Sequence, residues 1–158
     1  MKKVLIALDY NSTAQKIAEE GHALAKSMNA QTTLLHVISD AAYYSSDIYS
    51  PLMGFDSFTD LKFIGTTSVE ELKEAALDYL DKSKQHLHDT AIQTVVKEGD
   101  FGEQILATAA EMNADIIVMG THSRRGLEKI LVGSVAEKVL RHSTIPLFII
   151  PTKIVEEK

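Results

Sequence analysis

The chain has 158 residues, no cysteine, 16 basic and 22 acidic side chains, and a net charge of −6. This length predicts one domain with its own core, and the lack of cysteine excludes disulfides, thiolate metal sites and cysteine nucleophiles. An acidic chain is a poor candidate for nucleic-acid binding. The first apolar run is too short for a signal peptide or a membrane span, so we expect a cytoplasmic protein without membrane insertion.

The first 38 residues predict a strand, a helix and a second strand. Residues 3–8 form a short apolar run that stops at Asp9, as expected of a buried strand. Apolar side chains then recur at helical spacing over residues 14–28. Residues 31–38 are rich in Thr, Leu and Val, which favour an extended backbone.

Residues 40–66 show neither helical nor strand periodicity and hold six of the ten aromatic side chains. Loops of this length are uncommon unless they are functional or disordered, and such an aromatic content is unusual for disorder. Two interpretations stay open. The segment packs over the end of the sheet, or it forms a lid or partner surface beside a ligand.

The rest of the chain continues the alternation of helices and strands. Capping-box patterns predict helix starts at Ser68, Asp100 and Ser134. Strands are predicted over residues 92–97, 115–119 and 145–150. Residues 153–158 form a charged tail.

This alternation predicts an α/β fold with a single open five-stranded parallel sheet and helices on both faces. We expect residues 1–152 to form one domain with the insertion at 40–66. Open sheets of this kind bind ligands beyond the carboxyl ends of their strands.

One segment differs in charge from the rest of the chain. Residues 120–142 carry five cations and two anions, a balance of +3, which leaves −9 for the remainder. Three glycines lie there, and a glycine turn before a helix can offer backbone N–H groups to an anion. Arg124, Arg125 or Lys129 could offset phosphate charge. The glycine spacing matches neither a Walker A loop nor the dinucleotide-binding fingerprint.

The glycine pattern resembles that of the universal stress protein family. Nucleotide-binding members carry Gly-x-x-Gly, nine residues, then Gly-Ser or Gly-Thr. Here Gly120-Thr121-His122-Ser123 is followed by nine residues and then by Gly133-Ser134. The resemblance also covers an Asp after strand one, Leu-His-Val in strand two, and Ala-Asp-Ile-Ile-Val-Met-Gly in strand four. Only Ser123 departs, where the family has its second Gly. It would be strained at positive φ, and would add a hydroxyl at negative φ.

The resemblance implies a Rossmann-like fold of the adenine nucleotide alpha hydrolase type with strand order 3-2-1-4-5. It implies binding of ATP, or of ADP or AMP, with or without Mg²⁺, as part of a regulatory stress response. It places Asp9 near adenine and ribose, Val37 at adenine, Met119 and Gly120 along the ribose and phosphate approach, and Ser123, Gly133, Ser134 and Val135 at the phosphates. It also implies a homodimer through the last strand, which starts at Ile145 and ends at Ile150.

Other interpretations remain beside this one. The chain could be a slow ATP-hydrolysing enzyme, although no second acid accompanies Asp9 to hold Mg²⁺, so weak ATPase activity is the most we expect. It could also be a dimeric stress protein that binds no nucleotide and acts through partners. Asp9, Gly133 and Ser134 could serve only to start helices. We expect no catalytic residue and no metal site, and we expect His36 to be a packed core histidine.

Overall fold

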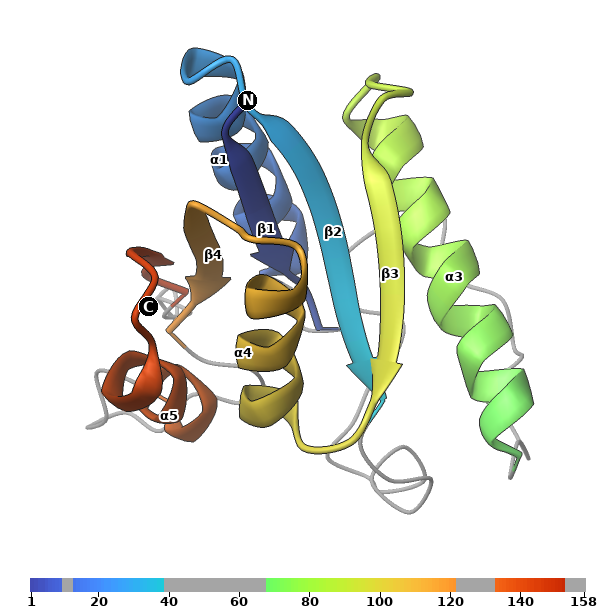
Figure 1. Cartoon of the computed structure of the whole chain (residues 1–158). Helices are drawn as coiled ribbons and strands as arrows, with labels where there is room; N and C mark the ends of the chain where they lie inside the picture. Colours follow the sequence, from blue (N-terminus) through green and yellow to red (C-terminus); the bar gives the residue numbers. More distant parts are fainter. Residues whose placement is uncertain (10–12, 39–67, 122–132, 153–158) are drawn as a thin grey trace, which may run out of the picture.

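The computed structural model describes residues 1–9, 13–38, 68–121 and 133–152 (Figure 1). The expected insertion at 40–66, the charged tail, Ser123 and the basic residues Arg124, Arg125 and Lys129 lie outside these ranges.

The strands and helices follow one another in the predicted order. They are β1 (Lys3–Ala7), α1 (Ala14–Ser27), β2 (Gln31–Ile38), α3 (Val69–His86), β3 (Gln93–Glu98), α4 (Phe101–Glu111), β4 (Ile116–Gly120), α5 (Ser134–His142) and β5 (Leu147–Ile150). Two of the predicted capping residues are confirmed. Ser68 Oγ accepts from the Glu71 N–H at 3.0 Å, and Asp100 Oδ2 accepts from the Glu103 N–H at 3.0 Å.

The five strands form one parallel sheet in the order β3-β2-β1-β4-β5, as expected. The chain therefore moves from β1 to one side of the sheet through β2 and β3, and to the other side through β4 and β5 (Figure 1). The boundary between β1 and β4 is the switch point, where neighbouring connections diverge and leave room for a ligand.

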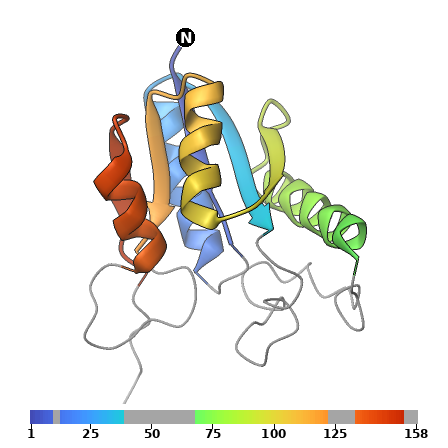
Figure 2. The same ribbon diagram turned by 60° about the horizontal axis from the view of Figure 1, so that its bottom comes forward.

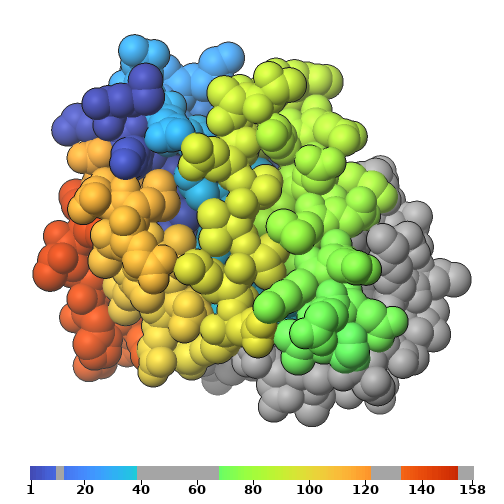
Figure 3. All heavy atoms as spheres, turned by 45° about the vertical axis from the view of Figure 1, so that its right-hand side comes forward, coloured from blue at the N-terminus to red at the C-terminus, as the bar shows by residue number. Residues whose placement is uncertain are grey.

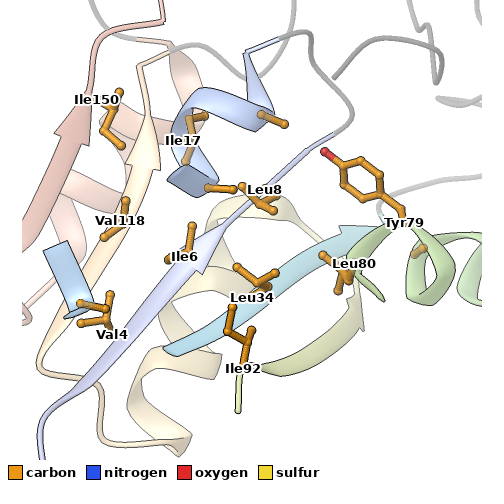
Figure 4. Close-up of a cluster of buried hydrophobic side chains, with 14 of the residues drawn as sticks. Val4, Ile6, Leu8, Ile17, Leu34, Tyr79, Leu80, Ile92, Val118 and Ile150 are labelled. Carbon is orange, nitrogen blue, oxygen red and sulfur yellow. The ribbon is translucent and has the colours of Figure 1, made fainter. Parts of the chain in front are cut away.

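Helices cover the sheet on both faces (Figures 1 and 2). Because side chains alternate along a strand, Val4 and Ile6 pack with α1 and α3 while Leu5 packs with α4 and α5. Figure 4 shows the first of these cores, with Ile17 of α1 and Leu80 of α3 directed at the same side of the sheet. Near-continuous apolar strands such as β2 follow from burial on both faces.

The sheet ends at β3 on one side, where its side chains reach the surface between α3 and α4 (Figure 3). Ion pairs flank this edge: Lys97 Nζ lies 3.1 Å from Glu111 Oε1 of α4, and Lys73 of α3 pairs with Glu98. In the described ranges, no helix has the length and apolar character needed to cross a membrane.

Candidate functional site

A pocket lies at the carboxyl ends of β1 and β4, at the switch point of the sheet. About 420 Å³ of space free of protein atoms lies in the pocket and in the open solvent at its mouth. Its walls come from three strands and three helices, with Leu35 and Val37 of β2, Ile17 of α1 and Ile105 of α4 among the lining side chains. Of the described lining residues, Asp9 alone is charged. Such a pocket suits a flat apolar ring held by few polar contacts.

Two buried polar side chains hydrogen-bond to the backbone at the end of β1. Tyr79 of α3 donates its hydroxyl to the carbonyl oxygen of Asp9 at 2.7 Å, and His36 Nδ1 lies 2.8 Å from the carbonyl oxygen of Leu8. The two rings meet edge to face, with centroids 6.0 Å apart. Figure 4 shows the Tyr79 phenol directed at the chain beyond Leu8. These contacts fix the backbone that presents Asp9 to the pocket.

Burial keeps both of these side chains neutral. It lowers the pKa of His36 to about 4, against the smaller opposing effect of the Leu8 carbonyl. His36 is therefore uncharged at neutral pH, and its Nδ1 carries the proton that it donates to Leu8. Burial, and secondarily the charge of Asp9, raises the pKa of Tyr79 well above its usual range, so its hydroxyl remains a donor. The expectation of a packed core histidine is confirmed, since His36 is 1% exposed.

Gly120 lines the pocket, and neighbouring side chains leave little room for a side chain at this position. A Cβ at this position would lie 2.6 Å from Ile17 Cδ1 and 2.6 Å from Thr152 Cγ2, which is closer than atoms can approach. Its φ is not in the positive range, unlike that of Gly99 at +134° in the turn after β3. The requirement for glycine at position 120 is thus one of packing between α1 and the end of β5.

The N-terminus of α5 faces this part of the molecule without a side-chain cap. The capping-box prediction for Ser134 is wrong. Gly133 is the N-cap, Ser134 is the first residue of the helix, and Glu137 pairs instead with Arg141 at 3.0 Å. The first intrahelical bond runs from the Glu137 N–H to the Gly133 carbonyl. The earlier N–H groups of the first turn are therefore the positive end of the helix dipole, which attracts anions.

Most of the predicted site residues lie around this one pocket. Asp9, Val37, Met119, Gly120 and Val135 line it, and Gly133 and Ser134 directly precede Val135 at the start of α5. Ser123 lies outside the described residues.

A model of the universal stress protein family matches residues 1–151. The chain belongs to the universal stress protein family. It is 28% identical over 155 residues to universal stress protein MJ0577 of Methanocaldococcus jannaschii, covering 96% of each chain. It is 30% identical over 151 residues to MJ0531 of the same organism, covering 94% of this chain and 81% of the relative.

Solved structures show the same fold. The structure of MJ0577 superposes with a TM-score of 0.72 at 27% identity, covering 98% of each chain. A universal stress protein solved in complex with cAMP superposes with a TM-score of 0.59 at 20% identity, covering 94% of this chain and 95% of the other.

Sequence reasoning missed several residues of this universal stress protein's site. Ile17, Phe101 and Ile105 line the pocket but read as ordinary core positions. Tyr79 lies on the buried face of α3, and its hydroxyl donates to the Asp9 carbonyl. A phenol on an apolar stripe is itself a signal, because a buried hydroxyl needs a partner.

Proposed function

We propose that this universal stress protein binds an adenine nucleotide, ATP or a related one, in the pocket at the ends of β1 and β4. The supporting observation is that, among the described residues, one pocket combines apolar walls, a single carboxylate at Asp9, and the N-terminus of α5, which has no side-chain cap at Gly133, next to Val135. The adenine ring would lie along Val37 and Met119. Asp9 would accept hydrogen bonds from ribose or from the adenine amino group.

The phosphates would lie at the start of α5, where backbone N–H groups and the helix dipole favour negative charge. A structural relative that holds cAMP supports an adenine nucleotide as the ligand class. We further propose a cytoplasmic, regulatory role, in which occupancy shifts the balance between conformations or partners.

Asp9 is the one carboxylate among the described pocket-lining residues, and no group of three or more acidic or histidine side chains gathers in the described ranges to hold a metal. Mg²⁺ is often held by one or two carboxylates together with phosphate oxygens and waters, so Asp9 and the nucleotide phosphates would share it if it binds. The nucleotide contacts proposed above do not depend on this metal.

The test is calorimetry of the purified protein with ATP, ADP, AMP and adenosine, together with mass spectrometry of small molecules released on denaturation. Ser134→Asp is the decisive variant. Ser134 is exposed in the first turn of α5, where a carboxylate suits the helix dipole but repels phosphate. We expect at least tenfold weaker ATP binding.

The matched control is Ser134→Asn, which has a similar shape and no charge, and which should retain most of the affinity. Gly133→Val is a second probe, since φ −70° and ψ 166° are open to any residue. A wild-type protein without affinity below millimolar, or a Ser134→Asp variant that binds ATP like wild type, would refute the proposed site.

We also propose a homodimer through residues 145–150. The support is that β5 is an edge strand, with Phe148 37% exposed on it and Leu140 58% exposed on the neighbouring α5. Pairing of two such edges would cover unpaired backbone groups. Light scattering over a range of concentrations should report twice the mass of one chain, 17.4 kDa, and a monomer at all concentrations would refute it.

A further inference from the structure

Thr121, directly after β4, uses its backbone and its side chain to hold the next parts of the chain. Its N–H donates to the carbonyl oxygen of Ile150 at 3.0 Å, and its carbonyl oxygen accepts from the Gly133 N–H. Its Oγ1 accepts from the Thr152 N–H at 3.0 Å and lies 3.1 Å from Thr152 Oγ1. Thr121 and Thr152 are 8% and 4% exposed.

This arrangement joins the end of β4 to the start of α5. Thr121 directly follows β4, Gly133 directly precedes α5, and a hydrogen bond connects their backbones. Gly133 is the N-cap of α5, so this bond also sets where the first-turn N–H groups of the helix begin. Two residues later, Val135 lines the pocket.

Thr152 contributes through both branches of its side chain. Its methyl carbon Cγ2 occupies the space beside Gly120, 2.6 Å from where a Cβ would stand. Packing of the methyl group there directs Oγ1 at Thr121. Valine at position 152 would keep the shape and lose the hydroxyl, whereas serine would keep the hydroxyl and lose the methyl group.

We propose that Thr121 and Thr152 are positioning residues that set the start of α5 for the phosphate groups of the bound nucleotide. The inference rests on the proposed function. The nucleoside half of the pocket is held separately, because Asp9 is fixed through Tyr79 and lies on the other side of the switch point. The threonine pair should therefore affect phosphate binding and leave nucleoside binding unchanged.

The experiment measures the affinities of wild type, Thr152→Val and Thr152→Ser for ATP and for adenosine by calorimetry, after thermal unfolding has shown that each variant folds. We expect Thr152→Val to weaken ATP binding about fivefold, the equivalent of one net hydrogen bond, with adenosine affinity unchanged. Thr152→Ser should bind ATP like wild type.

Thr108→Val is the matched control. Thr108 is a buried threonine of α4, 4% exposed, whose Oγ1 has no hydrogen-bond partner in the described part of the chain. Its replacement also removes a threonine hydroxyl but leaves the hydrogen bonds of Thr121 with Thr152 and Gly133 intact. The ratio of ATP to adenosine affinity should therefore not change.

The outcomes separate this inference from the proposed function. A wild-type protein that binds neither ATP nor adenosine overturns the proposed function itself. A wild type that binds ATP, with a Thr152→Val variant of the same affinity or with an equal loss for ATP and adenosine, overturns only the role of the threonine pair. If Thr152→Val does not fold, Thr152→Ala, which also lacks the hydroxyl, carries the same expectation.

Discussion

The hydroxyl of Tyr79 joins α3 to the end of β1, and Tyr79→Phe isolates its contribution. The side chain is fully buried, and its 2.7 Å bond to the Asp9 carbonyl spans 70 positions of sequence. Phenylalanine keeps the apolar packing and the ring contact with His36. The expected cost is about 1–2 kcal/mol, the loss of one buried hydrogen bond.

This cost converts into a measurable shift of the melting temperature. Unfolding entropy of about 2.1 cal/mol/K per residue implies, for a chain of this length, a fall of about 3–6 °C. Thermal unfolding followed by circular dichroism measures it directly. Because Asp9 lines the pocket, we also expect ATP and adenosine to lose affinity by the same factor, unlike the effect of Thr152→Val.

Ser83→Ala is the control for Tyr79→Phe. Ser83 is also fully buried on α3, but its Oγ donates to the Tyr79 carbonyl within the same helix at 2.9 Å. Such a bond adds little to helix stability, so the melting temperature should change by less than for Tyr79→Phe. An unchanged melting temperature for Tyr79→Phe, or an equal loss for Ser83→Ala, would refute the reasoning about the end of β1.

Two further predictions concern stability. The His36 pKa is about 4 in the folded protein against 6.5 unfolded, so over this range mainly the unfolded state takes up the proton as the pH falls. Stability should therefore drop by about 1.6 kcal/mol between pH 6.5 and 5. His36→Asn should flatten this part of the curve of unfolding free energy against pH. Gly120→Ala should lower the free energy of unfolding measured in urea by about 1–3 kcal/mol, because the added methyl group overpacks the site. At Gly102 the nearest atoms to an added Cβ belong to the flexible Lys138 side chain, the first at 2.9 Å. Gly102→Ala should therefore be neutral or stabilising, because alanine favours the helix.

Each of these two expectations has a clear contrary result. A His36→Asn variant whose stability falls with pH as steeply as that of wild type would mean that other groups govern this range. Equal stability of Gly120→Ala and Gly102→Ala would show that α1 and the end of β5 yield to a methyl group at no cost.

Features set by neighbouring residues were predictable. The bounds of β2 agree with the predicted residues 31–38, because a run of Thr, Leu and Val favours extended backbone wherever it is buried. The caps at Ser68 and Asp100 are also correct, since each side chain accepts from an N–H only three residues away. The alternation predicted a parallel sheet, while its strand order came with the family resemblance.

The N-cap of α5 could not be predicted from neighbouring residues alone. The pattern Ser134-x-x-Glu137 is that of a capping box and predicts Ser134 as the N-cap, yet the N-cap is Gly133, one residue earlier. Gly133 takes the N-cap position, and its N–H donates to the carbonyl oxygen of Thr121, directly after β4. A contact across the fold therefore overrides the local preference, and Ser134 becomes the first residue of the helix.

The sequence by itself determined the helices, the strands and the parallel sheet, because periodicity and caps are short-range properties. The residues expected around a nucleotide came from the family resemblance. Only the tertiary structure decided what holds those residues in place. The space that requires Gly120, the phenol behind Asp9 and the threonine pair at the base of α5 each join residues far apart in the chain. Such contacts depend on how the strands and helices pack, which no local pattern of the sequence records.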